Sequence, residues 1–194
     1  MNANHEFPRF IVGEFIVLRK VTVDDAKFIY DLRTSKVAEF LNQPPDYSVE
    51  SQRKWIESRN DSEVNYIIQN RLDERVGMVG IVDVNWNDRV SSVGRLLLKE
   101  WCINQSTPYG VEALLLTYGY VFDIMNFRKI SGVILGRNEK VFGLQKYLGM
   151  TQEGYMKDHV LLRGKPEDLY VMSLMKEDFP QYAEKIDKII SKFR

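Results

Sequence analysis

The chain has 194 residues, of which 44% are hydrophobic and 28% are charged, and its 27 Lys and Arg balance 27 Asp and Glu. This length and composition fit a single domain over residues 1–194 and exclude a disordered chain. The zero net charge argues against nonspecific nucleic-acid binding. No apolar run is long enough to span a bilayer. The one cysteine excludes an internal disulfide framework and a Cys-rich zinc site. We therefore expect a cytoplasmic enzyme or binding domain with no metal, no nucleic-acid partner and no membrane partner.

Apolar residues alternate in some segments and recur at helical spacing in others, with polar and turn-forming residues between them. Alternation predicts strands, and helical spacing after a capping residue predicts helices. Residues 1–10 are expected to form a tail. In chain order the elements are strand Glu14–Lys20, helices Thr22–Ser35 and Ser48–Ile56, strands Val64–Asn70, Val76–Val84 and Val90–Lys99, helix Pro108–Met125, strand Lys129–Leu135, helix Glu139–Tyr147, strands Tyr155–Leu162 and Asp168–Leu174, and the amphipathic helix Pro180–Phe193.

The connections between these elements indicate the fold class. The polar turns Arg71–Arg75 and Asn85–Arg89 are short, which favours an antiparallel meander of the strands around them. The strand, long helix and strand that follow from Val90 onward predict one β-α-β crossover near the centre of the chain. We therefore predict an α+β fold with a mixed, mostly antiparallel central sheet flanked by helices.

The most informative segment is the loop Glu100–Gly110, which joins a strand to the N-terminus of the long helix. Small and polar residues at a helix N-terminus offer several backbone N–H groups and the positive end of a dipole, which together suit a phosphate. Thr107 is a candidate N-cap, Pro108 fits the first helical position, and Gly110 permits a close backbone approach. An ordinary capped helix uses the same residue types, so this segment alone favours that simpler interpretation.

Further motifs favour a phosphate-binding loop over an ordinary capped helix, because they repeat the order and spacing of a known pattern. The chain resembles the GNAT superfamily of acyl-CoA-dependent N-acetyltransferases, and within it the branch of ribosomal-protein, polyamine and nucleotide-amino-sugar acetyltransferases. The resemblance extends roughly from Ile16 to Leu174. The matching positions are Gln105, Pro108 and Gly110 in the loop, Glu112-Ala113 after it, and then Asn138, Leu148-Gly149-Met150 and Glu153-Gly154.

The resemblance implies a GNAT-like fold with acetyl-CoA as cosubstrate and no metal. It implies that the pyrophosphate binds amides at the helix N-terminus and that the pantetheine arm pairs with the strand ending at Leu98. A backbone N–H near Leu97 or Leu98 would polarise the thioester carbonyl. The residues that would bind the cosubstrate are Leu97, Leu98, Gln105, Ser106, Thr107, Tyr109, Gly110, Val111, Asn138 and Phe142.

Two departures from the family pattern concern the chemistry. Pro108 replaces a glycine and removes one N–H from the expected phosphate site. Gln145 stands where many members have a tyrosine that protonates the CoA thiolate, so the acid is unassigned. The expected catalytic residues are Asp83 and Glu100 as base candidates, whereas His159 and Cys102 favour structural or exposed roles.

The sequence says least about the acceptor, the amine that would receive the acetyl group. The resemblance implies a pocket shaped by two connecting segments, in which we expect Asn42, Gln43, Trp86 and Arg89 to bind the substrate. A nucleotide-linked amino sugar is the first expectation for this small-molecule amine. A polyamine, a protein N-terminus and a non-catalytic acyl-CoA-binding domain are the alternatives. The amphipathic C-terminal helix offers a surface for homo-oligomer formation of unspecified stoichiometry.

Overall fold

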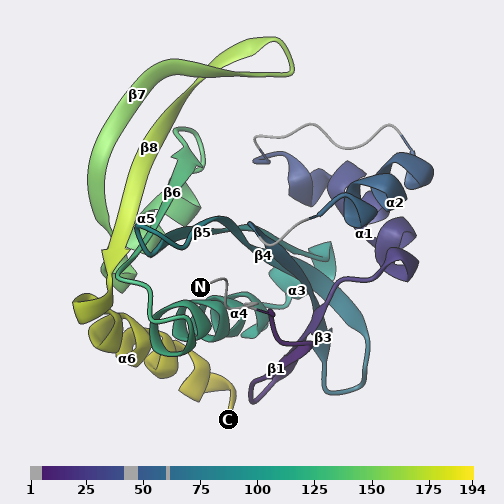
Figure 1. Ribbon diagram of the computed structural model, residues 1–194, viewed down its shortest axis with the longest axis horizontal. Coiled ribbons are helices and arrows are strands. Elements are labelled where there is room, and N and C mark those ends of the chain that lie inside the picture. Colours follow the sequence, from purple (N-terminus) through teal and green to yellow (C-terminus); the bar gives the residue numbers. More distant parts are fainter. Residues whose placement is uncertain (1–5, 42–47, 60–61) are drawn as a thin grey trace.

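The computed structural model describes residues 6–41, 48–59 and 62–194, and within them the chain forms a sheet of eight strands in the order β1-β2-β3-β4-β5-β6-β8-β7. The strands are β1 (Phe10–Val12), β2 (Ile16–Lys20), β3 (Val64–Asn70), β4 (Arg75–Asn85), β5 (Val90–Leu98), β6 (Lys129–Leu135), β7 (Thr151–Leu162) and β8 (Lys165–Met175). The helices are α1 (Ala26–Thr34), α2 (Val49–Glu57), α3 (Glu100–Asn104), α4 (Tyr109–Gly119), α5 (Glu139–Leu148) and α6 (Phe179–Ile190). Figure 1 shows α4 and α6 below the sheet, α1 and α2 away from them, and β7–β8 projecting as a long arm.

The predicted α+β fold is confirmed, with differences at particular elements. The expected tail contains β1, which pairs antiparallel with β2, and the loop before the long helix contains the short helix α3. Both were missed because three and five residues are too few to establish a period. The long helix continues beyond α4 as a π-helical turn, Tyr120–Ile124.

The relative direction of neighbouring strands changes at the centre of the sheet. From β1 to β5 and from β6 to β7 every neighbouring pair of strands is antiparallel. The predicted crossover makes β5 and β6 the parallel pair, and they pair only at Val90 with Lys129 and at Ser91 with Ile130. After these residues the two strands separate, which opens the sheet between them.

The main core lies between the sheet and the helices α4 and α6. Its aromatic residues stack closely: the rings of Tyr118 and Tyr182 are 4.9 Å apart at 19°, and those of Phe122 and Phe179 are 5.1 Å apart. Buried Glu112 of α4 accepts hydrogen bonds from the backbone N–H groups of Glu14 and Phe15, so the helix is fixed to the β1–β2 turn. This packing holds the N-terminus of α4 beside the separating strands.

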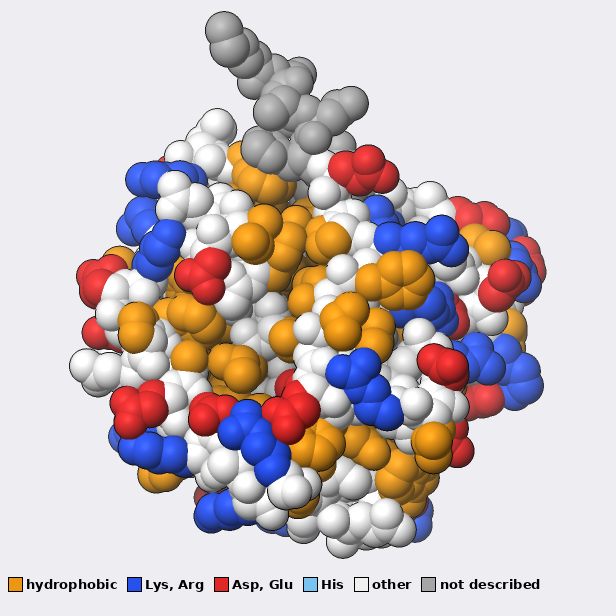
Figure 2. Space-filling view, turned by 90° about the horizontal axis from the view of Figure 1, so that it is seen from below, with side chains coloured by type: hydrophobic (Ala, Val, Ile, Leu, Met, Phe, Trp, Pro, Cys, Tyr) orange, Lys and Arg blue, Asp and Glu red, His pale blue; other side chains and the backbone are white. Residues whose placement is uncertain are grey.

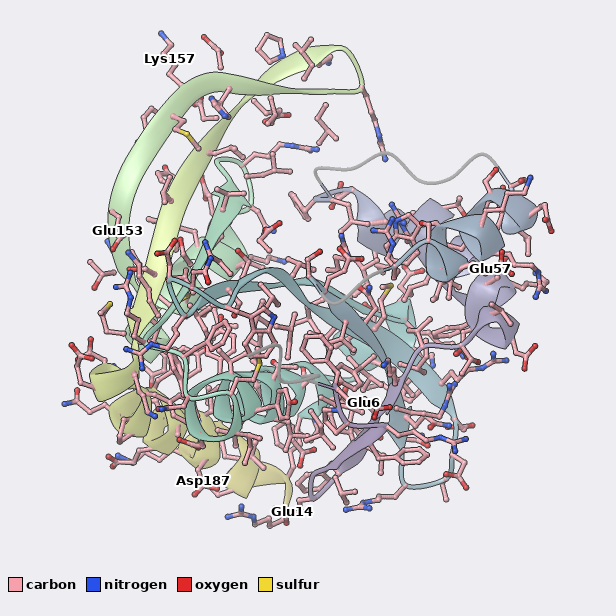
Figure 3. All side chains as sticks on the ribbon, viewed as in Figure 1. Glu6, Glu14, Glu57, Glu153, Lys157 and Asp187 are labelled. Atoms are coloured by element: carbon pink, nitrogen blue, oxygen red, sulfur yellow. The ribbon has the colours of Figure 1, made fainter. Side chains whose placement is uncertain are left out.

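Charged side chains lie around the outside of the molecule. In Figure 2 hydrophobic side chains occupy the middle of the face seen from below, and side chains of both charges lie mainly around its edge. Glu14 and Asp187, labelled at the lower edge in Figure 3, both bind Arg194, at 2.9 Å and 2.8 Å. Among the described residues, none of the helices is long and apolar enough to cross a membrane.

Candidate active site

The opening between β5 and β6 contains a cavity of about 560 Å³. Backbone of β5, including Leu97 and Leu98, forms one wall, and β6 with Asn138 and Val141 at the start of α5 forms the other. A smaller cavity of about 270 Å³ shares Gly94, Arg95 and Asn138 with it and extends toward Asp83 of β4. The two are neighbouring parts of one opening, which runs from the region of α3 to the irregular end of β4.

A β-bulge shapes this wall. Met78 of β4 pairs with Leu97 and Gly80 pairs with Gly94, so two residues of β5 face one residue of β4. Arg95, the first of the two β5 residues in the bulge, has a φ of 55°, in the left-handed region. The bulge bends β5 where it borders both cavities, next to the strand separation.

The side chain of Arg95 is fixed by a network that sequence reasoning missed. Its guanidinium donates to Glu63 and Asn65, each at 3.0 Å, and stacks on Trp55 at 5.1 Å. Arg59 donates to Glu63 at 2.8 Å and stacks on the same Trp55 at 4.7 Å. Burial raises the pKa of Glu63, but the hydrogen bonds and charges of the two arginines outweigh it and hold that pKa below its ordinary value.

Arg59 and Glu63 are four residues apart, but both follow the end of α2 at Glu57, so helical spacing gave no signal for this pair. The contact from Glu63 to Arg95 joins residues 32 positions apart, and a single sequence carries no pattern for such a contact.

The N-terminus of α4 differs from the prediction in its first residues. Thr107 does not cap α4: its side chain and its amide both donate to the Cys102 carbonyl, at 3.2 Å and 3.1 Å. The Ser106 amide donates to the Ile103 carbonyl at 3.2 Å. These two amides complete the end of α3, the helix that the sequence did not reveal. The Ser106 and Thr107 amides are therefore already hydrogen-bonded within the chain. Of the amides expected to bind phosphate, those in the first turn of α4 stay available.

That first turn presents the N–H groups of Tyr109, Gly110 and Val111, which have no acceptor within the helix. A Cβ on Gly110 would lie 3.1 Å from Cδ1 of Leu98, so glycine keeps the backbone of α4 close to the end of β5. Gln105 follows α3 as an exposed residue. Three open amides at the positive end of a helix fit a pyrophosphate.

The predicted base candidates lie at different ends of the opening. Asp83 is exposed, has a φ of 52° and lines the smaller cavity, whereas Glu100 begins α3 and lines the larger one. His159 is exposed on β7 and lines neither cavity. Buried Cys102 donates weakly to the Val76 carbonyl at 3.9 Å, and burial raises the pKa of its thiol, which does not suit a nucleophile.

Of the expected acceptor residues, Asn42 and Gln43 lie outside the described residues. The structure does not bring the other two to the opening. Trp86 packs edge-on against Phe127 at 5.1 Å, as part of the core, and the Arg89 carbonyl accepts a hydrogen bond from the Arg128 amide. Both residues belong to the β4–β5 turn, at the end of these strands where β5 and β6 are still paired, and neither lines the two cavities.

The start of α5 carries the two remaining expected residues. The Asn138 side chain accepts from the Val141 amide at 3.4 Å as an N-cap, and the residue lines both cavities. Phe142 stacks on Tyr170 of β8 at 4.1 Å, which fixes α5 to the arm.

The opening therefore fits acetyl-CoA. Beyond Ser91 and Ile130, the part of the chain that the structure describes has no ladder pairs between β5 and β6, so their facing backbone groups are available to a peptide-like pantetheine arm. The first turn of α4 lies next to the end of β5, since a Cβ on Gly110 would meet the Leu98 side chain at 3.1 Å. The described residues contain no group of three or more His, Cys, Asp or Glu side chains placed to hold a metal ion.

Comparison with known proteins agrees with this geometry. The family described as "Acetyltransferase (GNAT) domain" matches residues 16–151. The N-acetyltransferase p20 of Bacillus licheniformis, itself uncharacterized, is 23% identical over 173 residues, covering 86% of this chain and 96% of that protein. Spermidine N(1)-acetyltransferase of Vibrio cholerae is 19% identical, covering 87% of this chain and 98% of that protein. The structure of spermidine N-acetyltransferase from Vibrio cholerae with CoA and spermine superposes with a TM-score of 0.78 at 17% identity, covering 87% of this chain and 99% of that one.

Proposed function

The chain belongs to the GNAT acetyltransferase family and is an acetyl-CoA-dependent N-acetyltransferase, and on that premise we propose that it acetylates a small primary amine that enters beside Asp83. The observation that carries this proposal is the continuous opening. It runs from Ile103 and Asn104 of α3, along the unpaired edge of β5, to the smaller cavity that Asp83 lines.

The cosubstrate supplies an acetyl group activated as a thioester. The N–H groups of Tyr109, Gly110 and Val111 bind the pyrophosphate, and the backbone of β5 aligns the arm so that the thioester lies near the bulge at Arg95. A backbone N–H at Leu97 or Leu98 polarises the carbonyl. Asp83 binds the incoming ammonium group and, directly or through water, takes its proton.

For the acceptor we propose an amine that also carries an acidic group, with a nucleotide-linked amino sugar as the first candidate. Among the described residues, those of the smaller cavity that carry charge are Arg33, Arg95 and Asp83, and the Arg95 guanidinium is already paired with Glu63. Arginine suits phosphate groups, whereas a polyamine with several ammonium groups favours a wall with several carboxylates. Spermidine acetylation by the Vibrio cholerae relative keeps a polyamine as the second candidate.

The test is an assay of thiol release from acetyl-CoA with a panel of nucleotide-linked amino sugars, spermidine, spermine and short peptides with free N-termini. We expect turnover with an amino sugar and little with the polyamines. Turnover with spermidine alone would replace the first candidate by the second. If acetyl-CoA raises the melting temperature while no amine gives turnover, the chain is an acyl-CoA-binding protein and the transfer proposal fails.

A further inference from the structure

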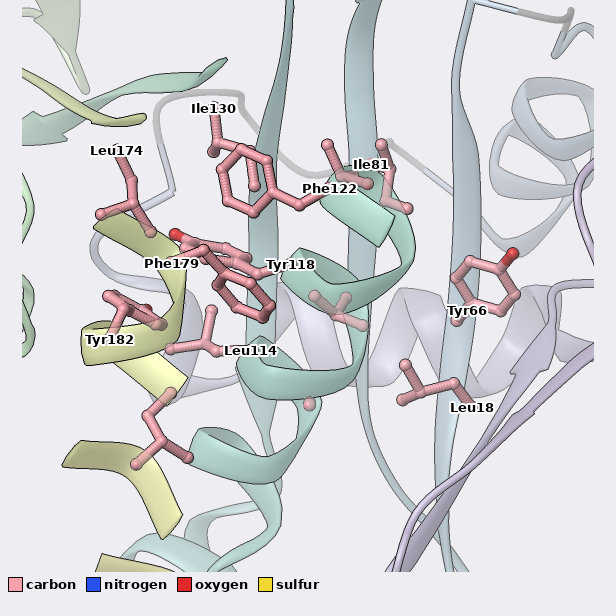
Figure 4. Packing of buried hydrophobic residues seen from close by; sticks show 14 of the residues in the cluster. Leu18, Tyr66, Ile81, Leu114, Tyr118, Phe122, Ile130, Leu174, Phe179 and Tyr182 are labelled. Carbon is pink, nitrogen blue, oxygen red and sulfur yellow. The ribbon is translucent and has the colours of Figure 1, made fainter. Parts of the chain in front are cut away.

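The inner end of the larger cavity contains a buried tyrosine hydroxyl. Tyr118 of α4 lines this cavity together with Gln145, Met150 and Met172, and is only 2% exposed. Figure 4 shows its side chain extending from α4 toward α6 and toward Leu174 of β8. Tyr118 therefore lies beneath the place where β5 and β6 separate, on the side of the sheet that α4 and α6 cover.

The partners of this hydroxyl leave its donor capacity weakly used. Its contact with the Met150 sulfur spans 3.8 Å, and a thioether is a weak acceptor. Tyr182 stacks on Tyr118, and the Tyr182 hydroxyl donates to the Gln145 side chain at 3.1 Å. The stack and this hydrogen bond fix the orientation of the Tyr118 ring. The hydroxyl therefore has a defined position at the end of the cavity, where it can donate a hydrogen bond to a ligand.

Gln145 supplies no proton of its own, because an amide does not titrate. A thiolate that leaves into an apolar cavity still needs a hydrogen-bond donor, since an unpaired buried charge is costly. Among the described residues, Tyr118 is the phenol that lines the cavity, whereas Tyr182 lies behind it and does not line the cavity.

We propose that the Tyr118 hydroxyl donates a hydrogen bond to the CoA sulfur as the thioester breaks, and that Gln145 and Tyr182 position it. This inference rests on the proposed function. The amine nitrogen forms the new bond to the acetyl carbon, the C–S bond breaks, and its electron pair goes to the sulfur. The amine proton passes to Asp83 or to water, and the thiolate takes a proton from solvent when CoA leaves.

The role is that of a hydrogen-bond donor and not of an acid that gives up its proton. Burial raises the pKa of Tyr118 to about 12, although hydrogen bonds with Tyr182 and Gln145 oppose the rise. An ordinary thiol has a pKa of about 8.5, so a thiolate does not remove this proton. Tyr118 stays protonated and stabilises the sulfur anion by a charge-assisted hydrogen bond.

The test compares CoA with desulfo-CoA, which lacks the sulfur, in calorimetric titrations from pH 6 to pH 10. The variants are Tyr118→Phe and, as a matched control, Tyr120→Phe. Tyr120 lies on the same helical segment and lines neither cavity. Because a donor favours the thiolate, the pKa of the thiol in bound CoA is expected to rise by about one unit in Tyr118→Phe.

The expected kinetic result is that Tyr118→Phe lowers kcat about tenfold, with the KM for acetyl-CoA unchanged within about twofold. The affinity for desulfo-CoA stays the same in all three proteins. An unchanged thiol pKa in Tyr118→Phe, or the same change in Tyr120→Phe, would overturn the inference. If the unmodified chain binds neither CoA nor desulfo-CoA, the proposed function itself fails, which is a separate outcome.

Discussion

The two ends of the opening are built from different parts of the chain. At the α4 end, the surface offered to a ligand is mostly backbone: the amides of Tyr109, Gly110 and Val111 and the unpaired edge of β5. At the Asp83 end it is mostly side chains from separate elements, among them Arg33 of α1 and Arg95 of β5. In the proposed function the first end binds the cosubstrate, whereas the second binds the individual acceptor.

This difference explains why a neutral chain can bind a strongly anionic cosubstrate. A helix N-terminus supplies oriented N–H groups and partial positive charge without any lysine or arginine. At the acceptor end, the described lining includes the charged residues Arg33, Asp83 and Arg95, and in the proposed function these select the acceptor. Substitutions at the two ends are therefore expected to have separable effects, and the following variants test that separation.

The largest effect is expected from Gly110→Trp at the α4 end. A Cβ there already lies 3.1 Å from Leu98, so the indole must extend into the space in front of the open amides. The KM for acetyl-CoA is expected to rise at least about 100-fold, a cost of about 3 kcal/mol, with little change in the acceptor KM. Steady-state kinetics with both substrates varied measures the two constants.

The matched control is Gly143→Trp in α5, where a Cβ meets nothing within 4 Å and the residue lines neither cavity. An unchanged acetyl-CoA KM in Gly110→Trp would mean that this loop does not bind the cosubstrate.

The next effect concerns Glu63, whose contacts fix the bulge between the two ends. Glu63→Gln is expected to lower the free energy of unfolding by about 2 kcal/mol at pH 7, because two arginines lose a charged acceptor. In the folded protein the pKa of Glu63 lies below its ordinary value of 4.5. Its stabilisation is therefore complete above about pH 4.5 and is lost as the pH falls through the lowered pKa.

Urea unfolding of the unmodified chain and the variant between pH 3 and pH 7 measures this difference. Exposed Glu57→Gln serves as the control and should show no difference at any pH. A Glu63 difference that stays constant down to pH 3 would show that the carboxylate charge is not its cause.

A smaller effect is expected at the acceptor end from Asp83→Asn. Loss of the carboxylate should lower kcat/KM for the amine about tenfold, while the KM for acetyl-CoA stays constant. The control is Asp88→Asn in the β4–β5 turn, which binds Asn85 and lines neither cavity. If both variants behave alike, Asp83 has no particular role in binding or deprotonating the amine.

The smallest effect is expected from Arg89→Ala. The sequence indicated a substrate-binding role, but Arg89 lies in the β4–β5 turn, away from both cavities. The acceptor KM should stay within about twofold of that of the unmodified chain, because no contact to the amine is lost. A large rise in that constant, measured with the best amine of the panel, would restore the original interpretation.

The sequence predicted β3 and β6 to the residue, because both are apolar runs between polar turns. It also located the loop at Gly110 and the start of α5 at Glu139, which depend on local backbone conformation. Contacts between distant segments could not be predicted in this way. The Glu63–Arg95 pair, the position of Trp86 in the core, and the Tyr118–Tyr182 stack exist only once the sheet and helices are assembled.

The first turn of α4 is proposed to bind the cosubstrate through its amides, and the alignment of the arm along β5 depends on this contact. The measurement is a ¹H–¹⁵N correlation spectrum of the labelled chain during titration with CoA. We expect the largest shifts at the amides of Tyr109, Gly110 and Val111, with smaller ones at Ser106 and Thr107, whose N–H groups already bind carbonyls of α3. Saturable binding of CoA that leaves the three α4 amides unshifted would contradict the account.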